Sequence, residues 1–91
     1  MSQFSTTSAE HNAISEPLRK AVLGHVAEAG RAMKARGADE NSIEQMRRVY
    51  RDIMSHKSKW AVQGALERTK HFTRGNDASI TAALRLVKGD M

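Results

Sequence analysis

Residues 43 to 60 read IEQMRRVYRDIMSHKSKW, and the hydrophobic pattern of this stretch decides the fold. In its first half, apolar residues recur at spacings of three and four, the period of an amphipathic helix with one buried face. The residues that form this apolar stripe are Ile43, Met46, Val49 with Tyr50, and Ile53. No part of the chain shows the alternation of polar and apolar residues that is typical of strands. The sequence therefore predicts an all-α protein.

The same stretch contains a break in the pattern. Four polar residues run together at positions 56 to 59, and the apolar pattern that resumes at Trp60 is shifted in phase. A single helix through both halves would have about 30 residues, whereas helices of globular proteins usually have roughly 8 to 20. We therefore predict that the second helical element is bent or split near residues 56–58, with Ser58 as N-cap if it is split. Gly64 is the other candidate for the break.

Upstream of this stretch, the sequence predicts one long helix. Ser15 followed by Pro17 is typical of a helix start, with Ser as N-cap and Pro in the first turn. Gly37, preceded by Lys34 and Arg36, is typical of a helix end. The apolar residues between these signals are Ile14, Leu18, Val22, Val26, Ala29 and Met33. A second row, of small residues that would let another helix approach closely, contains Ala21, Gly24, Ala27 and Gly30.

Downstream, residues 73–77 have the composition of a turn, and Asp77 or Ser79 can cap a last helix that Gly89 ends. The apolar residues of that helix are Ile80, Ala83, Leu84 and Val87. The predicted architecture is an antiparallel helical hairpin, its second element bent or split, followed by a short C-terminal helix. Residues 13–91 form this single helical domain.

Residues 1–12 are rich in Ser and Thr and reach their first acidic residue only at Glu10. This composition predicts a disordered N-terminal tail. An alternative interpretation is the export signal of a secreted bacterial effector, which also tends to be rich in Ser and poor in acids. The absence of cysteine and of long apolar runs favours a cytoplasmic protein with no membrane association.

A domain of this size buries a modest fraction of its surface and is marginally stable alone. A hairpin with one short extra helix would leave part of both apolar stripes uncovered, so we expect a homodimer. The predicted core comprises Leu18, Val22, Val26, Ala29, Met33, Ile43, Met46, Val49, Ile53, Trp60, Leu66, Ile80, Leu84 and Val87.

Positive charge is concentrated in one segment of the chain. The formal net charge is +5, and residues 47 to 74 carry eight basic side chains against two acidic ones. Such a concentration predicts a surface that binds something negative. The candidate partner-binding residues are Arg47, Arg48, Arg51, Lys57, Lys59, Arg68, Lys70 and Arg74, of which the first five are expected to be exposed. Trp60 lies among them, either in the core or as a stacking face.

Motifs for other functions are missing or incomplete. The chain has no cysteine, and its four histidines lack metal-ligand spacing, so we expect neither a metal nor a cofactor. A helix-turn-helix template can be laid across Gly37, but Asp39, Glu40 and Glu44 would then face phosphates. No nucleophile turn, Gly-rich phosphate loop or carboxylate pair in an apolar context is present, so we expect no enzyme activity.

These observations predict a small non-enzymatic helical regulator, adaptor or inhibitor. Its basic residues 47–74 would bind an acidic protein surface. The alternative is a nucleic-acid-binding protein that contacts phosphates through the same residues without strong sequence readout. The two differ in salt dependence, which is steep for phosphate contacts and weaker for an interface with an apolar centre.

Overall fold

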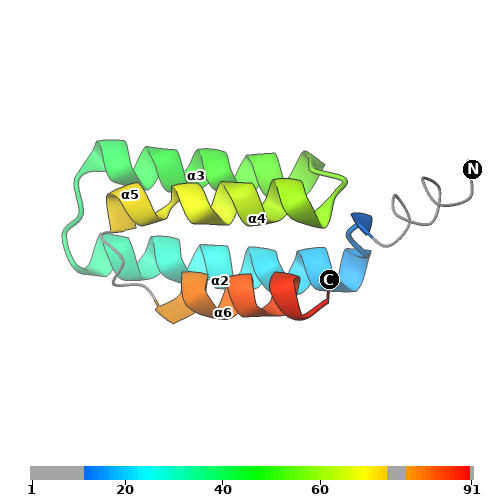
Figure 1. The fold of residues 1–91 in the computed structure, drawn as a ribbon. Coiled ribbons are helices and arrows are strands. Elements are labelled where there is room, and N and C mark those ends of the chain that lie inside the picture. The colour runs from blue at the N-terminus through cyan, green and yellow to red at the C-terminus, as the bar shows by residue number, and fades with distance from the viewer. Residues whose placement is uncertain (1–11, 74–77, 91) are drawn as a thin grey trace, which may run out of the picture.

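The computed structural model describes residues 12–73 and 78–90, and it confirms the all-α prediction (Figure 1). This part of the chain contains four helices of ten or more residues and one single turn. They are α2 (Glu16–Ala35), α3 (Glu40–Ser55), α4 (Lys59–Arg68), α5 (Lys70–Thr73) and α6 (Ala78–Gly89). The only β-type pairing among the described residues is an isolated bridge between Ala13 and Ser58.

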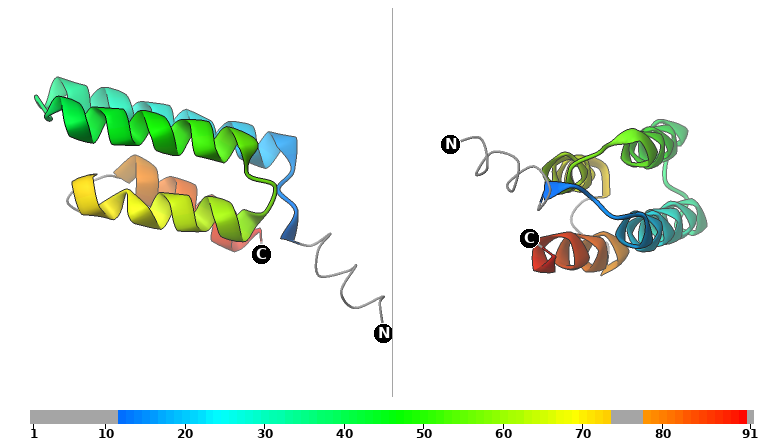
Figure 2. Two further views of the ribbon diagram at one scale, coloured as in Figure 1. Left: turned by 90° about the horizontal axis from the view of Figure 1, so that it is seen from above. Right: turned by 90° about the vertical axis from the view of Figure 1, so that its right-hand side faces the viewer.

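The four longer helices pack as an antiparallel bundle. Along the chain α2, α3, α4 and α6 run in alternating directions, and each lies beside two others (Figures 1 and 2). The contacts join α2 with α3, α3 with α4, α4 with α6, and α6 with α2, so the four helices enclose one core. The end-on view in Figure 2 shows this square arrangement, with α2 and α3 forming one side and α4 and α6 the other.

Local signals set most of the helix ends. The Ser15 hydroxyl accepts a hydrogen bond from the Leu18 N–H at 3.2 Å and so caps α2, which has Pro17 in its first turn. Gly37 follows the end of α2 with a φ of +79°, in the left-handed region that glycine adopts without strain. Asp39 precedes α3 as N-cap without a side-chain bond to the backbone of that helix. Residues 74–77 lie outside the described residues. They include most of the predicted turn at residues 73–77 and the predicted Asp77 cap.

The second element is split where the sequence predicted a break. Helix α3 ends at Ser55 and α4 begins at Lys59, with the Ser58 hydroxyl accepting from the Ala61 N–H at 3.1 Å. The segment before α2 stabilises this α3–α4 connection, because the Ile14 N–H donates to the Lys57 carbonyl oxygen at 3.0 Å.

Arg19 in the first turns of α2 also holds the reversal. Its guanidinium donates to the carbonyl oxygens of Ile53, Met54 (3.1 Å) and His56 (2.6 Å) at the C-terminal end of α3. These are carbonyls that a helix end leaves without intrahelical partners. A cation at this end also offsets the helix dipole.

Most of the predicted core is buried, but three of its residues are not, and one residue expected to be exposed is buried. Trp60 is 66% exposed, and Ile43 is only half-buried and lies outside the core cluster. Lys59, expected to be exposed, is buried at 6% exposure. Leu18 is half-buried and packs against the core from its edge. Buried residues that the sequence analysis left out of the core are Ile14, Val62, Ala65, Thr69, Thr73 and Ala83.

The errors at Lys59 and Trp60 have one cause. Trp60 is the first apolar residue after the break, but α4 takes the register of the later apolar residues, in which Val62, Ala65 and Leu66 face the core. Lys59 lies three residues before Val62 and shares its face, while Trp60 lies two residues before Val62 and points away. The Lys59 ammonium remains paired inside, at 2.9 Å from the Asp90 carboxylate and 2.8 Å from its carbonyl oxygen.

Candidate binding surface

The exposed side of α3 carries three arginines, as the sequence analysis predicted. Arg47, Arg48 and Arg51 are all exposed. The carboxylate of Glu44 lies 3.5 Å from Arg47 and 3.5 Å from Arg51, so it offsets part of their charge. Arg48 makes no ion pair with the residues that the structure describes. Exposed pairs of this kind contribute little to stability, so these arginines are free to engage a partner.

Arg68 joins this surface because the chain reverses between α3 and α4. Arg48 and Arg68 are 20 positions apart in the sequence, yet both line one groove between α3 on one side and the end of α4 with α5 on the other, with a volume of about 420 Å³. We call it the α3–α4 groove. Asp52 and His71 also line this groove, and its other lining residues are Asn41, Gln45, Val49 and Phe72. The groove therefore combines two arginine guanidinium groups with apolar surface from Val49 and Phe72. Arginine and aromatic residues are enriched in protein interfaces.

The remaining candidates divide into three groups. Lys57 and Lys70 are exposed at opposite ends of α4, and Lys70 pairs with Glu67 at 3.3 Å. Lys59 does not belong to the surface, because its ammonium is buried against Asp90. Arg74 lies outside the described residues. We define the basic surface as Arg47, Arg48, Arg51 and Arg68, with Lys57 and Lys70 at its margins.

A second groove, which the sequence analysis missed, runs along the outer side of the α2 and α3 pair. It consists of two successive hollows, one near the α2–α3 turn with a volume of about 230 Å³ and one near Met54 with a volume of about 560 Å³. The linings of the two hollows are one helical turn apart, at Leu23 and Ala27 on α2 and at Tyr50 and Met54 on α3. We call this groove the α2–α3 groove. Its apolar lining includes Leu23, Ala27, Gly30, Ile43, Tyr50 and Met54. Its basic lining includes Lys20, Arg31, Lys34 and Arg47.

The spacing of basic residues in α2 indicates this groove, but the net charge counted along the chain does not. Lys20, Ala27, Arg31 and Lys34 follow helical spacing and therefore share one face of α2. The first 46 residues have almost no net charge, because their acids offset these cations in a linear count. Glu28 is one such acid, and it lies away from the groove, where its carboxylate accepts from the Ser79 hydroxyl at 3.3 Å.

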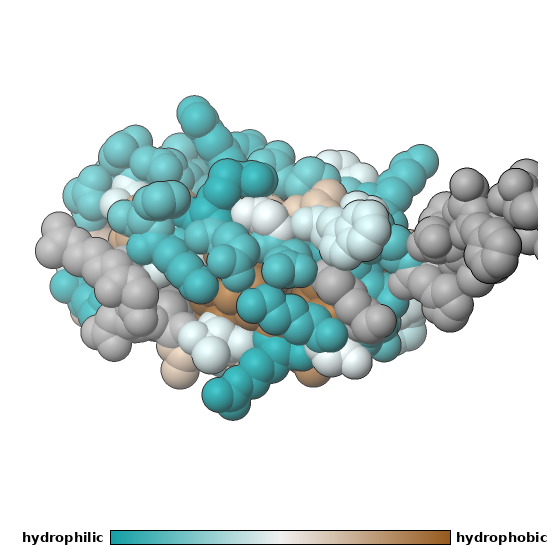
Figure 3. All heavy atoms as spheres, in the orientation of Figure 1, coloured by the Kyte–Doolittle hydropathy of each residue, from teal (hydrophilic) through white to brown (hydrophobic). Residues whose placement is uncertain are grey.

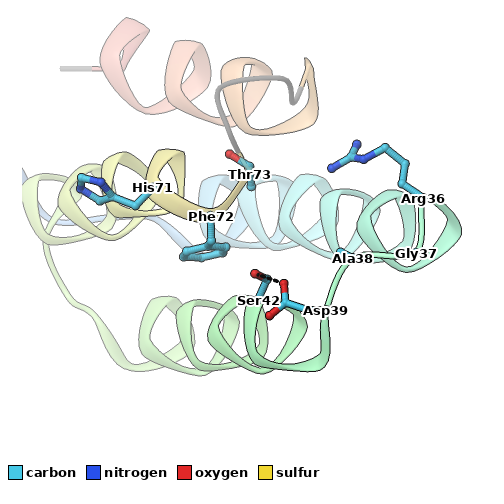
Figure 4. Close-up of a pocket in the computed structure, with 8 residues that line it drawn as sticks. All are labelled: Arg36, Gly37, Ala38, Asp39, Ser42, His71, Phe72 and Thr73. Carbon is cyan, nitrogen blue, oxygen red and sulfur yellow. Dashed lines mark hydrogen bonds between the residues drawn. The ribbon is translucent and has the colours of Figure 1, made fainter.

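A further hollow lies at the end of the bundle that contains the α2–α3 turn (Figure 4). It has a volume of about 600 Å³, and Figure 4 shows Arg36, His71 and Phe72 around it. Asp39 accepts a hydrogen bond from the Ser42 hydroxyl at 2.7 Å beside it. Thr73 borders the hollow immediately before residues 74–77, which lie outside the described residues. The described lining brings no set of groups together that would do chemistry.

The face formed by α4 and α6 is mostly hydrophilic, with apolar side chains visible between the two helices (Figure 3). The exposed Trp60 belongs to α4, where it shares a face with Gly64 and Arg68 at spacings of four. The Arg68 guanidinium leans toward this row, 3.6 Å from the position that a Cβ on Gly64 would take.

Two further classes of site are absent from the described residues. No group of three or more His, Asp or Glu side chains is placed there to hold a metal ion. No helix among them is long and apolar enough to cross a membrane.

Comparison with protein-family models, with curated proteins and with solved structures found no match to this chain.

Proposed function

We propose that this chain is a small non-enzymatic regulator, adaptor or inhibitor that binds an acidic surface of a protein partner through its basic surface. The observation that carries the proposal is that Arg48 and Arg68, far apart in the sequence, line the same groove. Within the described residues neither guanidinium has an acidic partner in an ion pair. Arginine forks that lie beside apolar surface are typical anchors of protein interfaces.

The apolar part of the groove favours a protein partner over a phosphate backbone. Val49 of α3 and Phe72 of α5 line the groove beside the two arginines, and Asp52 lines it as well. A phosphate backbone gains nothing from apolar lining and is repelled by a carboxylate. A protein surface can fill the apolar part and donate a hydrogen bond to Asp52.

A nucleic acid is the second candidate, and the exposure of Trp60 favours it. Single strands bind where aromatic side chains offer a stacking face near cations. Trp60, Gly64 and Arg68 provide such a row on α4. The row contains one aromatic residue and one cation, whereas single-strand-binding surfaces usually stack several bases, so we rank this candidate second.

Affinity capture from a lysate of cells that encode the protein tests the proposal. The bait is the full chain, with and without nuclease treatment, and bound material is eluted by a salt series. We expect protein partners that survive nuclease treatment. Loss of all bound material after nuclease, with a log-linear dependence of affinity on salt, would instead support the nucleic acid.

A charge-reversal pair locates the interface. Arg48→Glu combined with Arg51→Glu should abolish capture, because attraction becomes repulsion at exposed positions. The matched control is Arg36→Glu combined with Arg85→Glu, which makes the same charge change at exposed residues outside the basic surface. Equal capture by both double variants would show that the basic surface is not the interface.

A further inference from the structure

The α2–α3 groove has an apolar floor that the fold leaves uncovered. Met54 is 57% exposed at one end, and Leu23, Ala27 and Tyr50 are half-buried along its length. Gly30 leaves the floor open because it has no side chain, and a Cβ there would lie in ordinary contact with the Met46 side chain, at 3.7 Å. The apolar linings of the two hollows therefore follow each other, one helical turn apart, along the outside of the α2 and α3 pair.

The rim of this groove is positively charged. Lys20, Arg31 and Lys34 are exposed on α2 and make no ion pair with the described residues, and Arg47 lines the groove from α3. The acid at the far end, Glu16, is already offset by Arg19 at 3.2 Å. The groove is therefore apolar at its floor and cationic along its rim.

The groove has the length and shape to hold a helix. Its lining on α2 extends from Glu16 to Lys34, about 27 Å at the helical rise of 1.5 Å per residue. Amphipathic helices dock in such grooves through apolar residues at helical spacing. We infer that the α2–α3 groove is the docking site for an acidic amphipathic helix of a protein partner. This inference rests on the proposed function, because it takes the partner to be a protein.

Charge complementarity decides against a second copy of this chain as the occupant. A symmetric dimer across the groove would bring the same lysines and arginines of two copies together, and like charges across an interface are costly. An acidic helix instead places carboxylates against the rim and apolar residues on the floor.

The probe for this site is a synthetic peptide of about 18 residues, long enough to span the groove at the helical rise. It carries Leu at i, i+3, i+4 and i+7 spacing, Glu elsewhere on its flanks, and a fluorescein label for anisotropy measurements with the full chain. One control peptide has Lys in place of Glu. A second has the same composition in an order that breaks the apolar face. We expect saturable binding of the acidic amphipathic peptide alone, weaker at high salt.

Two glycines of α2 provide a matched pair of variants. Gly30→Leu puts a bulky side chain on the floor of the groove, whereas Gly24→Leu makes the same change on an exposed part of α2 with nothing within 4 Å. Both replace a helical glycine by a better helix former, so both should fold. Gly30→Leu should weaken peptide binding by about tenfold or more, the scale of loss when an anchor of an interface is displaced. Gly24→Leu should bind like the parent.

A reversal of the rim provides an independent readout. Arg31→Glu combined with Lys34→Glu should reverse the charge preference of the groove. This variant should bind the Lys control peptide more tightly than the acidic peptide. If Gly30→Leu fails to fold, Ala27→Leu replaces it, because Ala27 also lines the floor.

Several results would overturn the inference. The first is equal binding of the acidic amphipathic peptide and its scrambled control. The second is an equal effect of Gly30→Leu and Gly24→Leu on peptide binding. The third is a parent protein that is dimeric and becomes monomeric with Gly30→Leu. If the parent protein sediments with phosphatidylserine vesicles and the Gly30→Leu variant does not, the groove binds a lipid surface instead. The proposed function has a separate test, the lysate capture with the Arg48→Glu and Arg51→Glu variant. That variant does not change the floor of the α2–α3 groove, so the two proposals can fail independently.

Discussion

At the scale of single residues, burial separates side chains that stabilise the fold from those available for binding. Ile53 and Trp60 both continue the apolar pattern of the sequence, but Ile53 is fully buried and Trp60 is 66% exposed. Lys59 shows the converse, since a charged residue occupies an interior position and keeps its ammonium paired with Asp90. The rotation of each helix about its axis decides these outcomes, and residue type alone does not.

Ile53→Ala and Trp60→Ala should therefore have very different effects on stability. Removing most of the fully buried Ile53 side chain leaves a cavity and should lower the free energy of unfolding by about 2–5 kcal/mol. Trp60→Ala should change it by less than about 0.5 kcal/mol, as is usual for exposed positions. Urea denaturation followed by circular dichroism measures both. A loss at Trp60 comparable to that at Ile53 would contradict the register of α4.

At the scale of elements, signals within one helix were predictable and signals between helices were not. Ser15, Gly37 and Ser58 act on their own backbone, so the helix boundaries that they mark follow from the sequence. The phase shift after the break marks a new apolar face on α4, but the burial of Lys59 and the exposure of Trp60 at its start follow from how α4 packs against α3 and α6. The same holds for the two grooves, because each needs side chains from two helices.

Arg19 is the clearest element-scale contact that the sequence did not indicate. Its side chain reaches from the start of α2 to three carbonyl oxygens at the end of α3, across 34 to 37 residues of sequence. Arg19→Met keeps most of the apolar stem and removes the donors. Because hydrogen bonds from charged groups typically contribute about 1.5–3 kcal/mol, we expect a loss of that size in the free energy of unfolding.

Lys20→Met is the control for this variant. Lys20 is the exposed neighbour of Arg19, so its substitution should change stability by less than about 0.5 kcal/mol. Equilibrium urea denaturation of both variants makes the comparison. If Arg19→Met unfolds at the same urea concentration as Lys20→Met, the contacts at the end of α3 contribute nothing measurable.

At the scale of the whole molecule, the ring of four helices changes the argument about self-association. The expectation of a homodimer rested on apolar stripes left open by a hairpin with one short helix. In the described residues α4 and α6 complete the ring, and the stripe residues Val26, Met33 and Ile53 are at most 1% exposed. The surface of α2 and α3 that remains apolar is the floor of the α2–α3 groove, and its rim is cationic.

We therefore expect a monomer at micromolar concentration and low ionic strength. A dimer through the α2–α3 groove would oppose like charges at Lys20, Arg31 and Lys34, and these charges are least screened when salt is low. Multi-angle light scattering should give a mass near 10.1 kDa. High salt provides the informative comparison, because screening removes the repulsion while it leaves the apolar floor unchanged. A dimer that appears only at high salt would show that the rim charges prevent self-association, whereas a dimer at low salt would show that another surface pairs two copies.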